Sequence, residues 1–199
     1  MTERDLEGMT IAELAPQIRS KKISPVELTE LCLKRIGRLN PLLVAYTTVT
    51  EDSARAQAQA AESQIGRGDY LGPLHGMPIS VKENICIQGV RTTAGSKTLA
   101  EWVPDHDATI VERIKNAGAV VLGKTNMHEW AAGGTTINPF YGTTRNPWDT
   151  SRVAAGSSGG SGAAVDAAEM AQPAERRLET DHAAYRRGVS HGAAVIRPE

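Results

Sequence analysis

The chain has 199 residues and a net charge of −1, from 22 Lys and Arg against 23 Asp and Glu. This length suits one domain or part of a larger one. The balanced charge gives no electrostatic reason to expect direct binding to nucleic acid or to an anionic membrane. No stretch approaches the ~18 consecutive apolar residues that a membrane-spanning helix needs. The charged start "MTERDLEGMT" also lacks the apolar core of a signal peptide.

The first 66 residues are predicted to be helical. Thr10 to Glu13 forms a capping box, in which a hydroxyl accepts a backbone N–H and a glutamate reaches back. Ser24 to Glu27 repeats the pattern, with a proline at the first helical position. Residues 51–66 are rich in alanine and predict a third helix.

From Gly72 onward the pattern alternates between strands and helices. Residues 77–81 form a short apolar run that predicts a strand, and residues 119–122 form another. Between them, Asp107 can cap a helix that Gly118 ends. The order strand, helix, strand predicts an α/β fold with a largely parallel sheet.

The last two segments differ in composition from the rest of the chain. Residues 131–162 are rich in Gly, Thr, Asn and Pro, and a loop this long inside a compact domain is usually functional. Residues 166–199 are highly charged with poor apolar periodicity, which predicts a surface helix or a disordered tail.

One nucleotide-binding pattern can be set aside. Residues 118–125, "GAVVLGKT", satisfy the consensus G-x-x-x-x-G-K-[ST] of a phosphate-binding loop. That loop needs backbone N–H groups curled around phosphate, between a strand and a following helix. Here the four middle residues are apolar and favour a buried strand, and a helix precedes them. We therefore expect no nucleotide site.

Two side chains have a structural and a chemical interpretation. Lys82 ends the strand "MPISVK", where a lysine commonly keeps its ammonium in water; held in a dry pocket, it would become a neutral base. Ser157 lies in "GSSGGSG", which could be a flexible linker or a rigid loop that presents a serine. The local sequence leaves both alternatives open.

The remaining polar residues carry weaker signals. His75 and His128 have no second ligand at a metal-binding spacing, so no metal is expected. Cys32 and Cys86 form neither a disulfide framework nor a metal pattern, which predicts two buried thiols in a reducing, cytoplasmic protein. Glu129, beside a tryptophan, is as compatible with a structural role as with a catalytic one.

Taken together, three segments resemble the amidase signature family. The stretch "GPLHGMPISVKENICIQGVRTTAGS" is similar to that family's lysine segment, residues 106–149 to the segment that follows it, and "AAGSSGGSGAAV" to its glycine–serine signature. The similarity runs from about Thr10 to Val165, in the family's order. It implies an α/β fold with a helical N-terminal segment, followed by part of a mixed, largely parallel sheet with flanking helices.

The resemblance also implies roles for individual residues. The family hydrolyses amides, or transfers the released ammonia, through a Ser–Ser–Lys arrangement and an acyl-enzyme. Lys82 matches the base lysine, and Ser157 matches the bridging serine, which follows a cis peptide bond in the family. No cofactor is implied. The surrounding loop and substrate-side positions are Ser158, Gly156, Gly159, Gly160, Met127 and Glu129.

The third member of the arrangement is missing from the sequence. The family's nucleophilic serine follows the bridging serine by 24 residues, a position that Asp181 occupies here. A gapped match of "LETDHAAYRR" to the family's "LGTDTGGSIR" places Tyr185 there instead. Neither is the activated serine. We therefore expect residues 1–165 to be the N-terminal part of an amidase signature domain, residues 166–199 to be a diverged charged tail, and this fragment to be inactive.

Two alternatives accompany the amidase hypothesis. The parent enzyme could be the A subunit of a tRNA-dependent amidotransferase, although "MHEWAAGGTT" looks closer to general amidases than to the "MDEFAMGSS" of that amidotransferase chain. The chain could also be a non-catalytic assembly module that pairs through an unfinished sheet edge. The expected partners are a small amide substrate and, at that edge, another copy or another protein.

Overall fold

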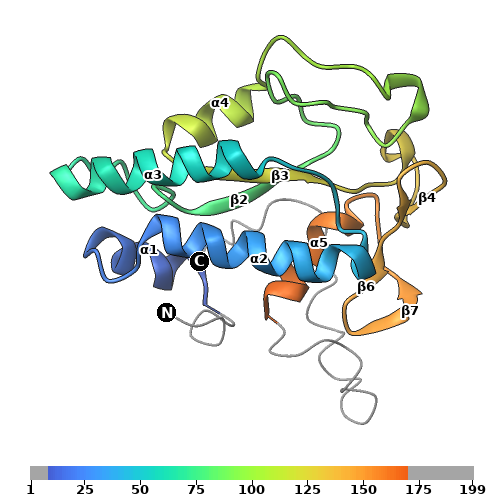
Figure 1. The fold of residues 1–199 in the computed structure, drawn as a ribbon. Coiled ribbons are helices and arrows are strands. Elements are labelled where there is room, and N and C mark those ends of the chain that lie inside the picture. The colour runs from blue at the N-terminus through green and yellow to red at the C-terminus, as the bar shows by residue number, and fades with distance from the viewer. Residues whose placement is uncertain (1–8, 170–199) are drawn as a thin grey trace.

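The structure is a computed structural model that describes residues 9–169, drawn as a ribbon in Figure 1. The elements of the first half are α1 (Ile11–Arg19), α2 (Pro25–Leu43), β1 (Tyr46–Val49), α3 (Glu51–Arg67), β2 (Pro78–Lys82) and the 3₁₀ turn η2 (Lys97–Leu99). Those of the second half are α4 (Thr109–Asn116), β3 (Val120–Thr125), the 3₁₀ turn η3 (Glu129–Ala131), β4 (Ile137–Asn138), β5 (Gly142–Thr143), β6 (Arg145–Asn146), β7 (Asp149–Val153) and α5 (Gly159–Glu169). The predicted α/β class is confirmed.

The three N-terminal helices begin where the sequence predicts. At α1 the Thr10 hydroxyl accepts from the Glu13 backbone N–H, and the Glu13 carboxylate accepts from the Thr10 N–H at 2.7 Å. At α2 the Ser24 hydroxyl accepts from the N–H groups of Val26 and Glu27, both at 3.1 Å. These caps satisfy donors that a helix start would otherwise leave free.

The central sheet is mixed and has the strand order β1-β3-β2. Strands β2 and β3 are parallel, as the strand–helix–strand pattern predicts, and their register pairs Lys82 with Thr125. Strand β1, which the sequence did not predict, runs antiparallel to β3. Its sequence, YTTV, is short and polar, so its pairing depends on the tertiary structure.

Helices cover both faces of this sheet. Val120 and Leu122 of β3 pack against α2 and α3, whereas Val81 and Val121 pack against Val111 of α4. Figure 1 accordingly shows α4 on the other side of the sheet from α2. Strand residues that alternate between two buried faces explain why these runs are almost continuously apolar.

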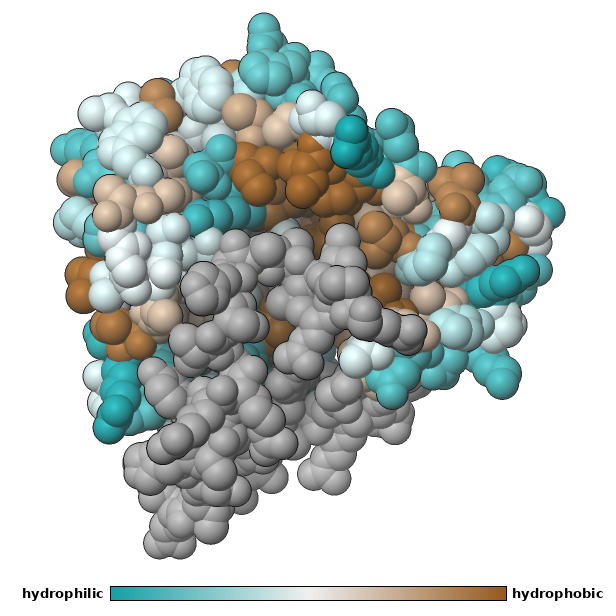
Figure 2. Space-filling model, turned by 180° about the vertical axis from the view of Figure 1, so that it is seen from behind, coloured by the Kyte–Doolittle hydropathy of each residue, from teal (hydrophilic) through white to brown (hydrophobic). Residues whose placement is uncertain are grey.

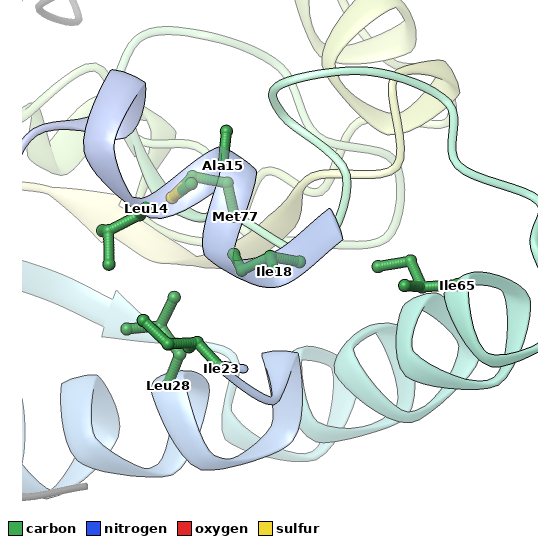
Figure 3. Packing of buried hydrophobic residues seen from close by; sticks show 7 residues of the cluster. All are labelled: Leu14, Ala15, Ile18, Ile23, Leu28, Ile65 and Met77. Carbon is green, nitrogen blue, oxygen red and sulfur yellow. The ribbon is translucent and has the colours of Figure 1, made fainter. Parts of the chain in front are cut away.

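A separate cluster ties α1 to the rest of the fold. Its members come from α1, the start of α2, the end of α3 and the entry to β2, and they are drawn as sticks in Figure 3. They are Leu14, Ala15, Ile18, Ile23, Leu28, Ile65 and Met77. Leu14, Ala15 and Ile18 form the buried face of α1.

Helix α4 differs from the sequence prediction at its start. Asp107 does not cap it: the residue before the helix is Ala108, and no side chain caps there. The Asp107 carboxylate instead accepts from the Gln88 backbone N–H at 2.7 Å and from Lys115 Nζ at 2.6 Å. These bonds connect the preceding loop to the end of the helix, so the aspartate serves tertiary structure rather than helix initiation.

Some features concern the surface of the described part. The outer edge of β2 has no partner strand within residues 9–169, and apolar residues gather around a hollow on the face in Figure 2.

None of the helices in residues 9–169 is long and apolar enough to cross a membrane. Cys32 and Cys86 are free and half-buried, whereas the sequence predicted two buried thiols.

Candidate active site

The lysine that ends β2 and the first serine of the glycine-rich loop meet in the structure. Lys82 Nζ donates a hydrogen bond of 2.9 Å to Ser157 Oγ, across 75 residues of sequence. Lys82 is half-buried, and the loss of water around its amine lowers its pKa below the usual 10.5. A lysine with a lowered pKa next to a serine hydroxyl is a plausible base–hydroxyl pair.

The loop that carries Ser157 is fixed by backbone contacts. The peptide bond between Gly156 and Ser157 is cis, as the resemblance implied. The Gly156 N–H donates to Gly134 O at 2.9 Å, and the Ser157 carbonyl accepts from the His128 N–H at 3.0 Å. The serine is thus held between two loops, which a flexible linker would not be.

Glycine is required where this loop approaches other backbone. A Cβ at Gly160 would lie 2.5 Å from the carbonyl oxygens of Ala45 and Asn126, and a Cβ at Gly156 would collide with the Thr135 carbonyl. At Gly159 the collision would be with the Thr136 side chain. The three predicted glycine positions therefore let the loop and α5 lie against the neighbouring chain.

The threonine at position 136 supports the loop in a way that the sequence did not indicate. Its hydroxyl accepts from the Gly159 N–H at 2.8 Å and donates to Ala155 O at 3.1 Å. Thr136 has no exposed surface. One buried hydroxyl thus holds the chain on both sides of Ser157.

Two more hydroxyl contacts accompany the Lys82–Ser157 pair. Thr125, the register partner of Lys82, lies with its Oγ1 2.8 Å from Ser161 Oγ on α5. Tyr46 of β1 lies with its hydroxyl 2.6 Å from Ser80 Oγ on β2. Burial raises the pKa of the Tyr46 phenol to about 12. The sheet therefore carries several buried hydroxyls near this site, which residue types alone could not have located.

The other predicted site residues lie close by, with mainly structural contacts. The Ser158 carbonyl accepts from the N–H groups of Ser161 and Gly162 and so begins α5. Met127 is buried, and its carbonyl accepts from the Asn138 side chain at 3.0 Å. Glu129 Oε1 accepts from Ser96 Oγ at 2.6 Å.

The histidines are occupied by local hydrogen bonds. His75 Nδ1 accepts from the Leu71 N–H at 3.1 Å, and its Nε2 lies 3.0 Å from Gln64 Oε1. His128 Nδ1 lies 3.0 Å from Thr135 O. No group of three or more His, Cys, Asp or Glu side chains within residues 9–169 could hold a metal ion.

Two further predictions can be placed. Residues 120–125 of the pattern "GAVVLGKT" form strand β3, preceded by helix α4, so this segment has the architecture of a buried strand and not of a phosphate loop. The two alternative nucleophile positions, Asp181 and Tyr185, lie outside the described residues, as does most of the predicted tail at 166–199.

Comparison with known proteins places these residues in a family. A family model described as "Amidase" matches residues 27–174. The A subunit of the glutamyl-tRNA(Gln) amidotransferase of Moorella thermoacetica is 47% identical over 165 residues, which cover 83% of this chain and 34% of that protein. The corresponding protein of Methylobacillus flagellatus is 51% identical over 158 residues, covering 79% and 32%.

Solved structures agree with these relatives. A structure described as a vestigial protein complex that reveals the evolutionary origins of an s-triazine catabolic enzyme matches with a TM-score of 0.78 at 45% identity, over 81% of this chain and 36% of that one. The native peptide amidase from Stenotrophomonas maltophilia matches with a TM-score of 0.73 at 37% identity, over 79% and 34%. The chain spans about a third of the length of the curated relatives it matches. It belongs to the amidase family, the amidase signature enzymes that act on amide C–N bonds.

Proposed function

We propose that Lys82 and Ser157 are the proton-handling pair of an amide-cleaving site of the Ser–Ser–Lys type. The observation that carries this proposal is the 2.9 Å hydrogen bond between Lys82 Nζ and Ser157 Oγ. The lowered pKa of Lys82 supports it, because a neutral amine has the free electron pair that a base needs.

In this mechanism Ser157 is a relay and not the attacking group. A second serine would attack the carbonyl carbon of a small carboxamide and give its proton to Ser157 Oγ, as Ser157 gives its own proton to the Lys82 amine. Return of a proton along the same route to the departing nitrogen breaks the C–N bond and leaves an ester on the attacking serine. Water then hydrolyses that ester and releases the carboxylate.

We further propose that this 199-residue chain is inactive, or nearly so, by itself. The positions aligned with the attacking serine hold Asp181 or Tyr185, and loss of the nucleophile of a serine hydrolase lowers the rate on the order of 10⁶-fold. The proposed division into residues 1–165 and 166–199 rests on the same sequence argument. Ammonia release from simple carboxamides by the full chain should equal the protein-free rate, and clear turnover would contradict this proposal.

A chimera tests the roles of Lys82 and Ser157 separately from that inactivity. Residues 10–165 would replace the matching segment of a full-length relative, which supplies its own nucleophile. Lys82→Ala and Ser157→Ala should each lower kcat/KM of the active chimera by roughly 10²–10⁴-fold. Lys97→Ala, which changes an exposed lysine, is the matched control. Full activity in either site variant would contradict the assignment.

A second candidate function is amide chemistry within an amidotransferase. The identities of 47% and 51% to amidotransferase A subunits favour it, whereas the segment "MHEWAAGGTT" favours a general amidase. The same chimera distinguishes the two when glutamine is compared with simple carboxamides as the substrate. Preference for glutamine would support the amidotransferase, and preference for other carboxamides would support the amidase.

The third candidate function is a non-catalytic assembly module. The two free cysteines favour a reducing, cytoplasmic location for the chain under this candidate as under the others. The outer edge of β2, unpaired within residues 9–169, is the feature that favours the module. Such an edge exposes N–H and C=O groups that can pair with another chain. Size-exclusion chromatography with light scattering of the full chain tests it: a stable dimer or larger assembly supports the module, and a well-behaved monomer argues against it.

A further inference from the structure

A pair of buried opposite charges lies next to the Lys82–Ser157 pair and takes no part in the chemistry described above. Glu83 follows Lys82 in the chain, and Lys124 precedes Thr125, the register partner of Lys82. Neither Glu83 nor Lys124 has any exposed surface. A charged side chain this deeply buried is costly unless its surroundings compensate it.

The contacts of Lys124 hold the segment that follows Lys82. Its ammonium donates to Ile85 O at 2.6 Å and to Thr92 Oγ1 at 2.8 Å. Thr92 is itself buried. The Lys124 side chain of β3 thus ties both ends of the loop between residues 85 and 92 to the sheet.

The contacts of Glu83 hold the next part of the same segment. Its Oε1 accepts from the backbone N–H and from the hydroxyl of Thr93, both at 2.9 Å. Its Oε2 accepts from the Thr47 hydroxyl at 2.6 Å, and that hydroxyl lies 3.3 Å from Lys124 O. The carboxylate therefore ties β1 to residue 93, and the Thr47 hydroxyl extends this link to β3.

The end of the segment 83–96 contacts the turn that holds Ser157, the other member of the pair. The Ala94 carbonyl accepts from the Trp130 N–H at 2.9 Å, and the Ser96 hydroxyl donates to Glu129 at 2.6 Å. In the same turn, the His128 N–H donates to the Ser157 carbonyl at 3.0 Å. Hydrogen bonds and short stretches of chain therefore connect the two buried charges to the backbone that carries Ser157.

We propose that Glu83 and Lys124 are positioning residues for the Lys82–Ser157 pair: together they fix the segment 83–96, which begins next to Lys82 and ends at the turn that holds Ser157. This inference rests on the proposed function of that pair. Loss of water is the cause that lowers the Lys82 pKa, so loosening of this segment that admits water to the amine would raise that pKa.

The electrostatics of Lys124 agree with this arrangement. Loss of water lowers the pKa of Lys124 to about 8, and the negative charge of Glu83, with a smaller contribution from Cys86, opposes that effect. The ammonium is thus kept charged at neutral pH by the carboxylate it compensates. Removing either partner would leave one buried charge uncompensated.

The test follows the titration of Lys82 itself in the full 199-residue chain. Acylation of each lysine by a small anhydride, measured by mass spectrometry across pH, gives the midpoint of Lys82 without any turnover. Loosening of the segment 83–96 should admit water to the amine, so Lys124→Met and Glu83→Gln should each raise that midpoint toward 10.5. The double variant Glu83→Gln/Lys124→Met, which buries no unpaired charge, should raise it as well.

Raised midpoints in all three variants support the proposal, because the midpoint reports on the surroundings of the Lys82 amine itself. Lys97→Met, an exposed change, should leave the midpoint unchanged. A folded double variant with an unchanged or lowered midpoint would overturn the proposal. Because measuring the Lys82 midpoint needs no catalysis, the positioning role of Glu83 and Lys124 can be tested even if the chimera shows that Lys82 is dispensable for amide cleavage.

Hydrogen exchange covers the case in which the single variants do not fold. In the double variant, which buries no unpaired charge, the amides of His128 and Trp130 should exchange at least about tenfold faster than in the wild type, since the segment 83–96 has lost its ties to Lys124. The amides inside α2 serve as the internal reference. Unchanged protection at His128 and Trp130 would refute the positioning role.

Discussion

Lys82 Nζ lies 2.9 Å from Ser157 Oγ although 75 residues separate them in the chain. Two features produce this contact. The parallel register of β2 and β3 places Lys82 beside Thr125, and the hydroxyl contact between Thr125 and Ser161 draws the start of α5 to the same place. The contact thus depends on a sheet, a helix and a loop being correctly placed at once.

The first prediction concerns the pKa of Lys82. Because burial lowers it below 10.5, Lys82 should be acylated at a lower pH than expected for a fully solvated lysine. Ser157→Ala should leave this low midpoint in place, since loss of water and not the hydroxyl is its cause. The folded protein binds fewer protons than the unfolded chain at pH values just below 10.5, so this group makes stability rise with pH in that window. A midpoint of 10.5 or above in the wild type would contradict this prediction.

The second prediction compares two glycines of α5. Gly160→Ala should lower the free energy of unfolding by about 1–3 kcal/mol, because the new Cβ would press on backbone atoms of Ala45 and Asn126. Gly162→Ala is the matched control, since a Cβ there meets nothing within 4 Å and alanine favours a helix by roughly 0.5–1 kcal/mol. Urea denaturation measures both, and equal effects would show that α5 does not pack closely at Gly160.

The third prediction concerns the hydroxyl of Thr136. Thr136→Val keeps the shape of the side chain but leaves the Gly159 N–H and the Ala155 carbonyl without their partner. Such buried unsatisfied groups cost about 1–3 kcal/mol, so urea denaturation should show a loss of that size. Thr136→Ser retains the hydroxyl and should keep most of the stability. In the active chimera the valine variant should also lower kcat, because the loop around Ser157 loosens.

The fourth prediction concerns His75 and pH. His75 is buried, and loss of water lowers its pKa below 6.5. Its Nδ1 accepts from the Leu71 N–H, so a proton there would remove that bond. The folded pKa is depressed, hence the unfolded chain binds more protons just below pH 6.5, and stability is lost as the pH falls through this region.

Thermal or urea unfolding between pH 5 and 8 should therefore show stability that rises with pH up to about 6.5. His75→Gln should flatten this dependence, whereas His106→Gln, at an exposed histidine, should leave it. A wild-type protein whose stability does not change between pH 5 and 6.5 would argue against a buried neutral His75.

Local sequence signals were reliable where neighbouring residues decide the structure. The capping residues Thr10 and Ser24 begin α1 and α2 as predicted, because a cap is formed within a few residues. Asp107 is also a residue type that commonly caps a helix and precedes one here, yet it binds Gln88 and Lys115. The difference lies in the tertiary structure. The Asp107 carboxylate finds a partner in a loop that is distant in the sequence, and the sequence alone does not show this contact.

The buried charges mark a second limit of prediction. Lys124 appeared only as part of a misleading phosphate-loop pattern, and Glu83 carried no signal at all. Both are completely buried, because segments from residues 85–93 and from β1 close over them. A charged residue in a sequence is expected at the surface, and only packing reveals the exception.

The sequence alone determined the α/β class and the helix starts, because these follow from residue types and their spacing. It also showed the family resemblance, and that resemblance indicated which lysine and which serine to examine. It could not determine that Lys82 and Ser157 would touch, that Thr136 would hold the loop, or that Glu83 and Lys124 would be completely buried. Those facts depend on the register of β2 with β3 and on the close approach of α5 at Gly160. Contacts between distant segments exist only once the chain has folded, and burial then sets the pKa of each group.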